Sequence, residues 1–233
     1  GMSLAAPEIA PMDDRRFTAF GLYNPCVALK VDQKMVLNDI DFDDKAKIYV
    51  LTGPNRGGKS VITCAVGQAQ ALCQLGLPVP AASAVISPVT AIYTHFPTGS
   101  EGDGAIEKGR LGEECDRLNK IFDTLDSHSL ILLDESFSST GSYEASYIAS
   151  EVLTGFSMIG CKCLFSTHLH ELSGQLDEIN KKCAAMGGVP IDTLVAGIHG
   201  SERSFEITRA KPDGKSYARD IAEKFGLLYD RIM

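Results

Sequence analysis

The sequence contains no tryptophan, no long apolar run and no dense cluster of basic residues. Its 233 residues are 44% hydrophobic and 22% charged, a balance that is typical of a soluble globular domain. No apolar segment approaches the roughly 20 residues that a membrane span needs, and no basic stretch before an apolar run indicates a signal peptide. We therefore expect a cytoplasmic protein without membrane association.

Positive charge is scarce relative to negative charge. The chain has 22 Lys and Arg residues against 30 Asp and Glu residues, a formal net charge of -8 at pH 7. An acidic chain gains little from counterion release on a phosphate backbone. We therefore expect no DNA binding by this chain alone.

Paired cysteine motifs are also missing. The seven cysteines are an odd number, none of them forms a CxxC pair, and no histidine cluster accompanies them at zinc spacing. Most of them lie in apolar segments. The pattern favours reduced core thiols over disulfides or a structural zinc site.

Apolar β-rich segments alternate with segments of helical periodicity along most of the chain. The predicted strands are 35–42, 47–52, 91–95, 129–134 and 161–166, with a hairpin over 190–210. The predicted helices are 58–75, 107–125, 142–159, 169–176 and 216–227. This alternation predicts an α/β fold with a mainly parallel sheet and helices on both faces.

The ends of the predicted domain follow from composition. Residues 1–16 are rich in Ala, Pro and Asp, and they are expected to form a flexible lead-in that begins with a tag remnant. Residues 17–233 are expected to form one domain. Within it, 77–88 and 98–104 are predicted to be loops.

The segment from Gly53 to Ser60 matches the phosphate-binding pattern G-x-x-x-x-G-K-[ST] without a mismatch. It follows a predicted strand and opens a predicted helix, a context that disfavours a chance glycine-rich turn. Backbone N–H groups and the helix N-terminus attract phosphate, while Lys59 is expected to reach the β- and γ-phosphates and Ser60 to bind Mg²⁺. The predicted nucleotide contacts are Gly53, Pro54, Asn55, Arg56, Gly57, Gly58, Lys59, Ser60 and Val61.

Two carboxylates, Asp134 and Glu135, end the apolar strand 129–134. The carboxyl ends of strands form the ligand-binding edge of such sheets. Asp134 is expected to hold Mg²⁺ through water, and Glu135 to orient and polarise an attacking water. A helix N-cap is the alternative, which the upstream phosphate motif disfavours.

A third polar group, His168, follows the next apolar strand. A lone histidine is usually structural, but a position at this strand end favours a hydrogen bond to the γ-phosphate or to the lytic water. We therefore predict Lys59, Glu135 and His168 as the catalytic set.

The order of these motifs resembles that of ABC-type ATPases, and the residues resemble more specifically the ATPase domain of the MutS family. The phosphate loop matches the family's G-P-N-x-G-G-K-[ST], and the resemblance covers about residues 20–229. The other matching segments are Val79–Ala81, Asp134–Glu135 with Thr140 and Glu144, Ser166–Leu172 against A-T-H-x-x-E-L, and Lys215–Tyr217 against K-S-Y-G.

This resemblance implies Mg-ATP as the ligand and a homodimer through the ATPase face, with composite sites between subunits. It also implies that ATP turnover drives movements of DNA-gripping domains, which are absent from this chain. The Asn55 equivalent helps to position the γ-phosphate. Met35 takes the place of the aromatic that stacks on adenine, and its thioether makes a weaker contact.

The chain departs from the family in the signature that faces the partner subunit, Ser-x-Phe-x-x-Glu. The serine is replaced by Gly109 and the phenylalanine by Leu111, while the glutamate is kept as Glu114. Arg110 offers a substitute cation for the lost serine contact. The resemblance is therefore to a divergent branch of the family.

Three functions are compatible with these residues. The favoured one is an ATPase that powers a DNA mismatch-repair or recombination-related protein. The second is an ATP-gated dimerisation module with weak or no hydrolysis, which the altered signature supports. The third, a small-molecule kinase, is disfavoured because such kinases usually lack both the glutamate and the histidine of this pattern.

Overall fold

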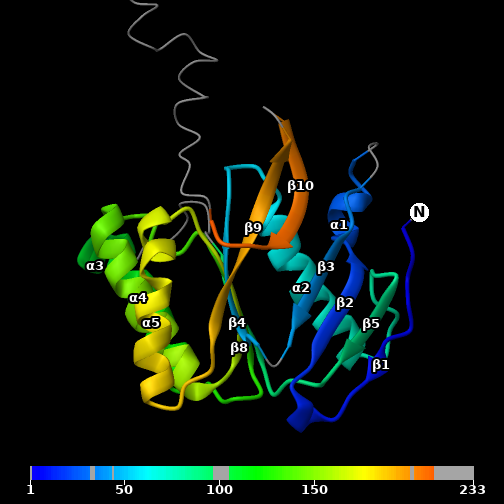
Figure 1. The fold of residues 1–233 in the computed structure, drawn as a ribbon, viewed down its shortest axis with the longest axis horizontal. Helices are drawn as coiled ribbons and strands as arrows, with labels where there is room; N and C mark the ends of the chain where they lie inside the picture. The colour runs from blue at the N-terminus through cyan, green and yellow to red at the C-terminus, as the bar shows by residue number, and fades with distance from the viewer. Residues whose placement is uncertain (1, 32–34, 44, 97–104, 200–201, 213–233) are drawn as a thin grey trace, which may run out of the picture.

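In a computed structural model, the structure describes residues 2–31, 35–43, 45–96, 105–199 and 202–212 (Figure 1). Helices and strands alternate along most of this part of the chain, and the fold is mixed α/β. The strands form two sheets of six and four strands.

The larger sheet has the strand order β10-β9-β4-β8-β7-β6. Strands β9, β4, β8, β7 and β6 run parallel to one another, and β10 is antiparallel to β9. The five parallel strands thus bring their carboxyl ends to one edge. The bounds are β4 Ile48–Thr52, β6 Ile92–His95, β7 Leu130–Asp134, β8 Lys162–Ser166, β9 Ile191–His199 and β10 Glu202–Arg209.

The smaller sheet has the order β1-β5-β2-β3 and mixed strand directions. Strand β1 is parallel to β5, while β2 is antiparallel to both β5 and β3. The bounds are β1 Glu8–Ile9, β2 Phe17–Leu22, β3 Asn38–Phe42 and β5 Ser83–Ile86.

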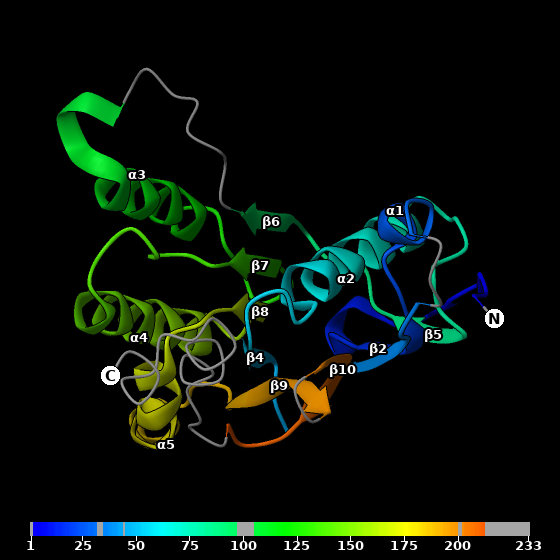
Figure 2. The same cartoon turned by 90° about the horizontal axis from the view of Figure 1, so that it is seen from above.

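Helices cover the larger sheet on both faces (Figure 2). The long helix α2 (Lys59–Gln74) lies between the two sheets, and α3 (Ala105–Phe122), α4 (Ser142–Ile159) and α5 (His170–Ala185) lie on the opposite face. Short α1 (Pro25–Ala28) and the 3-10 turn η1 (Met12–Asp14) belong to the smaller sheet's side.

Two hydrophobic cores follow from the alternation of side chains along the central strands. In β4, Tyr49 and Leu51 join the first core, on the α2 side, whereas Ile48 and Val50 join the second core, under α3, α4 and α5. Every residue of β4, β7 and β8 is buried, as expected for strands covered on both faces. This burial explains why these strands were visible in the sequence as continuous apolar runs.

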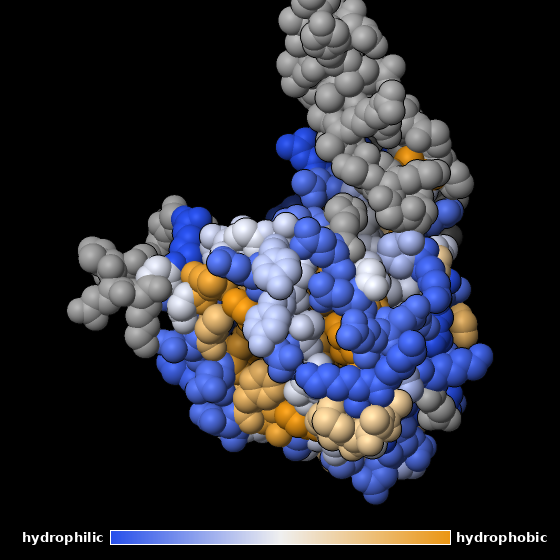
Figure 3. Space-filling view, turned by 60° about the vertical axis from the view of Figure 1, so that its left-hand side comes forward, coloured by the Kyte–Doolittle hydropathy of each residue, from blue (hydrophilic) through white to orange (hydrophobic). Residues whose placement is uncertain are grey.

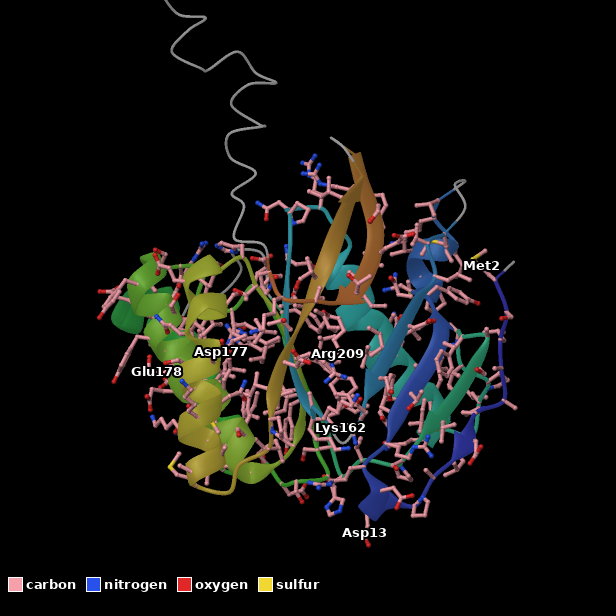
Figure 4. All side chains as sticks on the ribbon, in the orientation of Figure 1. Met2, Asp13, Lys162, Asp177, Glu178 and Arg209 are labelled. Carbon is pink, nitrogen blue, oxygen red and sulfur yellow. The ribbon has the colours of Figure 1, made fainter. Side chains whose placement is uncertain are left out.

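Arg209 of β10 connects the larger sheet to the smaller one (Figure 4). Its guanidinium donates to Asp192 at 2.5 Å and to Asp43 at 3.0 Å, and it lies 5.3 Å from the centre of the Tyr49 ring. Burial raises the pKa of Tyr49, because an ionised phenolate would lose its hydration there.

The prediction of a flexible lead-in over residues 1–16 is wrong for the residues that are described. Ala5 exchanges backbone hydrogen bonds with Val79, and Ala10 N–H donates to the Ile86 carbonyl at 3.1 Å. Strand β1 extends the smaller sheet beside β5. The segment is ordered by non-local backbone pairing, which its composition does not reveal.

Two other predicted segments differ from the structure in their secondary structure or in their bounds. The predicted loop over 77–88 contains β5, and α5 continues to Ala185 beyond the expected end at Leu176. The predicted loop 98–104 and the predicted helix 216–227 lie outside the described residues, as does the Lys215–Tyr217 segment.

The helix α3 is interrupted at Gly109, where φ is 67° and ψ is 164°. Side chains other than glycine rarely adopt this conformation. Another residue at this position would therefore be strained on this backbone. Glycine here accompanies a kink in the helix.

The face formed by α3, α4 and α5 is mainly hydrophilic, with apolar areas between the polar ones (Figure 3). Its exposed large hydrophobic side chains on α4 are Tyr143, Tyr147 and Met158. Within the described residues, none of the helices has the length and apolar content that crossing a bilayer requires.

Candidate nucleotide site

The loop of residues 53–58 connects the carboxyl end of β4 to the start of α2. At Gly53 φ is 135°, and a Cβ there would lie 2.8 Å from the Ala196 Cβ and 2.9 Å from the Ala196 carbonyl oxygen. Glycine therefore lets the loop leave β4 directly beside β9. The sequence motif is explained here by backbone geometry and by close approach to a neighbouring strand.

Lys59 is the first residue of α2 and is only 4% exposed. Its Nζ donates to the carbonyl oxygens of Gly53 at 3.1 Å and Pro54 at 3.2 Å. The same Nζ lies 3.4 Å from Glu135 Oε1. The structure thus brings the predicted lysine and the predicted glutamate into direct contact.

Glu135 follows the last residue of β7 and adopts a positive φ of 50°. Its backbone N–H donates to the Ser166 carbonyl at 2.8 Å, which ties it to the end of β8. Its Oε2 forms a hydrogen bond with Nδ1 of His168, two residues beyond β8. Since β8 lies between β4 and β7, three strand ends meet here.

The pKa values of Glu135 and His168 are shifted in opposite directions. Burial alone would raise the pKa of Glu135, but hydrogen bonds and charges from His168 and Lys59 outweigh it and lower the pKa. The hydrogen bond to Glu135 raises the pKa of His168. Glu135 is therefore ionised at neutral pH, and its bond with His168 favours the imidazolium.

Asp134 and Ser60 are the predicted metal ligands. Asp134 is 5% exposed and its Oδ1 accepts a hydrogen bond from the Ser166 hydroxyl, while Ser60 is exposed at the start of α2. Among the described residues no group of three or more His, Cys, Asp and Glu side chains is suited to a metal. One carboxylate and one hydroxyl suit Mg²⁺, which is usually bound with substrate phosphates and water.

A cavity of about 670 Å³ opens beside the loop. Its size suits a nucleotide-sized ligand. Gly53, Pro54, Gly57 and Asp134 do not border it. The predicted residues that do are Met35, Asn55, Arg56, Gly58, Lys59, Ser60, Val61, Glu135 and His168.

Sequence reasoning missed several residues of this cavity. Asn24 caps α1 by accepting the Val27 N–H at 3.1 Å, and its Nδ2 donates to the Val61 carbonyl at 3.2 Å. Phe205 reaches the cavity from a bulged part of β10 with a φ of 59°, and its ring lies over Gly58. An N-cap asparagine before proline is a visible signal for Asn24, whereas a bulge in a strand leaves no such signal.

Other residues that the sequence analysis matched to the family motifs do not line the cavity. Leu111 packs against the second core, and Glu114 accepts hydrogen bonds from the segment that follows Glu135. Thr140, just before α4, donates a hydrogen bond to the carboxylate of Glu144 in the first turn of that helix.

Comparison with known proteins decides the family. Residues 49–200 match the protein-family model of MutS domain V. The chain belongs to the MutS family.

Relatives in bacteria and animals support the same assignment. The chain is 38% identical over 154 residues to the DNA mismatch repair protein MutS of Prochlorococcus marinus, a match that covers 64% of this chain and 16% of that protein. It is 31% identical over 212 residues to MutS of Roseiflexus castenholzii, covering 87% of this chain and 19% of the relative. A probable DNA mismatch repair protein of Drosophila melanogaster is 32% identical over 174 residues, covering 73% and 14%. The chain thus spans about a fifth or less of the length of these curated relatives.

Proposed function

We propose that this chain is a Mg-dependent ATPase domain with a P-loop, ABC-ATPase-like fold. In this proposal it powers conformational changes of a DNA mismatch-repair or recombination-related protein. The observation that carries the proposal is the meeting of Lys59, Glu135 and His168 at three adjacent strand ends, beside a glycine loop and one cavity.

Hydrolysis would proceed by in-line attack of water on the γ-phosphate. Glu135, held ionised by its neighbours, accepts the proton of the attacking water. Lys59 and the loop amides stabilise the charge that develops on the phosphate oxygens. His168 holds the second carboxylate oxygen of Glu135 and thereby fixes the orientation of the base.

Ser60 and Asp134 are the residues that would hold Mg²⁺. The ion would supply charge neutralisation at the phosphates when bound. The hydroxyl of Ser166 orients the Asp134 carboxylate through its hydrogen bond, so Asp134 keeps one oxygen for an outer-shell water.

The partners follow from the family. We propose a homodimer through the ATPase face, and contact with DNA through parts of the protein outside this chain. The net charge of -8 supports the second point, because it disfavours phosphate-backbone binding by this chain. All seven cysteines are free thiols, which supports a reducing, cytoplasmic location.

Two substitutions test the assigned roles. Lys59→Ala should abolish ATP binding in calorimetry. Among the described residues that line the cavity, Lys59 is the only buried cation, and this variant removes it. Glu135→Gln should keep ATP binding and stop phosphate release, because the amide cannot accept the proton. Equal loss of ATP binding in both variants would refute the assignment.

Matched controls come from the surface of the same molecule. Lys182→Ala removes an exposed lysine of α5, and Glu178→Gln neutralises an exposed glutamate of the same helix. Both variants should bind and hydrolyse ATP like the unsubstituted protein.

A second function, an ATP-gated dimerisation module with weak or no hydrolysis, is favoured by one observation. Helix α3 is kinked at Gly109, the position that matches the partner-facing serine of the family signature. Light scattering with and without ATP, combined with phosphate release, separates the two functions. Dimerisation on ATP with no release beyond that of Glu135→Gln would favour the gated module.

A further inference from the structure

The turn that carries Glu135 is conformationally unusual. Both Glu135 and Phe137 have positive φ values, 50° and 65°, although neither is glycine. Such conformations persist only where surrounding contacts hold them. The contacts around residues 135–137 therefore decide where the Glu135 carboxylate points.

One side chain from a different element holds this turn. Glu114 of α3 accepts the Phe137 N–H at Oε2 with a distance of 2.5 Å. Its other oxygen, Oε1, accepts the Ser139 hydroxyl at 3.4 Å. A single carboxylate thus spans the turn just after Glu135.

Two further contacts, one from β6 and one in the second core, hold the same turn. His95, at the end of β6, forms a hydrogen bond of 2.8 Å between Nδ1 and the Ser136 hydroxyl. The Phe137 ring is completely buried in the second core. These contacts anchor the turn to the protein interior, and Glu114 closes it on the α3 side.

Glu114 does not line the cavity, so any effect of Glu114 on the site must act through the residues that it contacts. It is set in α3 between Leu111 and Leu118, both of which pack on the second core. A shift of α3 along this core would move the Glu114 carboxylate relative to the turn.

We propose that Glu114 is a positioning residue for Glu135, and that its carboxylate couples the position of α3 to the orientation of the hydrolytic base. This inference rests on the proposed ATPase function. For this role the side chain at position 114 must be long enough to accept the Phe137 N–H. Its charge matters less, because an amide oxygen can accept the same hydrogen bond.

Three substitutions separate reach from charge. Glu114→Asp keeps the charge but shortens the side chain, so kcat for ATP should fall about tenfold or more. Glu114→Ala should lose at least as much, while Glu114→Gln should keep most of the turnover. The Kd for ATP should change by less than about twofold in all three, because Glu114 does not border the cavity. Glu113→Ala is the matched control, since it removes a carboxylate from the adjacent position of α3.

A second readout does not need hydrolysis. The imidazole Nδ1 of His168 is bonded to Glu135, so its ¹⁵N resonance reports the orientation of the base. This resonance, assigned with His168→Ala, should shift in Glu114→Asp and stay in place in Glu114→Gln.

The results divide clearly. Loss of turnover in Glu114→Asp with unchanged ATP affinity, a shifted His168 resonance and rescue by Glu114→Gln supports the inference. Unchanged turnover and resonance in Glu114→Asp, a parallel loss of ATP affinity, or equal effects of Asp and Gln overturns it. Absence of hydrolysis by the unsubstituted protein would sink the ATPase proposal alone, because the resonance still tests the positioning.

Discussion

Replacing Lys162 by methionine is expected to stabilise this protein. Lys162 begins β8 and lies at the end of the larger sheet opposite the cavity, with its side chain only 1% exposed (Figure 4). Its Nζ is buried without a hydrogen-bond partner in the described part of the chain. Burial, together with the like charges of Lys47 and Arg15, lowers the pKa of Lys162 from 10.5 to about 8.

The shift sets the magnitude of the effect. In the unfolded chain the ammonium keeps its proton to about pH 10.5, whereas the folded protein releases it near pH 8. At pH 7 the folded state therefore carries a penalty of about 3 kcal/mol, from roughly 1.4 kcal/mol per pKa unit. Methionine fills a similar volume without a charge, so Lys162→Met should raise the free energy of unfolding by up to about that amount.

The sign of the pH dependence follows from proton binding. Between pH 8 and 10.5 the unfolded chain binds more protons at Lys162 than the folded protein, so the stability of the unsubstituted protein rises with pH in this window. The gain from Lys162→Met should therefore be full at pH 7 and shrink toward pH 10.5.

Urea denaturation at pH 7 and pH 10 measures both quantities, with Lys182→Met as the control because Lys182 is 52% exposed. The control should have the stability of the unsubstituted protein at both pH values. A Lys162→Met variant that is less stable at pH 7, or whose gain does not shrink with pH, would refute this reasoning.

Two other perturbations concern the site. The bond between His168 and Glu135 raises the pKa of His168, so its contribution to stability is full below pH 6.5 and is lost as the pH rises through the raised pKa. The difference in stability between the unsubstituted protein and His168→Ala, from urea titrations, should therefore be larger at pH 6 than at pH 9; equal differences would contradict the ion pair. Gly53→Ala would bring a Cβ to 2.8 Å from Ala196, so calorimetry should show at least about tenfold weaker ATP binding, and unchanged affinity would exclude the close approach.

The central elements were predictable because their signals are local. The buried strands β4, β7 and β8 have an apolar residue at most positions, and the limits predicted for α4 agree with the structure. By contrast, β1 and β5 have short and mixed sequences, and they are strands because distant segments supply their backbone partners: β5 for β1, and both β1 and β2 for β5.

The site shows the same division. Local patterns around Lys59, Glu135 and His168 predicted that three strand ends carry polar groups. Phe205 was not predicted as part of this region, and Glu114 was predicted only as a residue of the partner-facing signature. The place of Phe205 depends on a bulge in β10, and that of Glu114 on α3 lying beside the turn that follows β7. Neither position can be derived from spacing along the chain.

By itself the sequence determined the phosphate loop, the family and the alternation of strands and helices, because each is encoded in residues that are neighbours along the chain. Tertiary structure alone decided that β8 lies between β4 and β7, and therefore that Glu135 contacts both Lys59 and His168. It also decided that the Lys162 ammonium is buried with no hydrogen-bond partner among the residues that the structure describes. These contacts join residues that are far apart in sequence, and they arise only when the apolar faces of the sheet are covered and the chain closes around them.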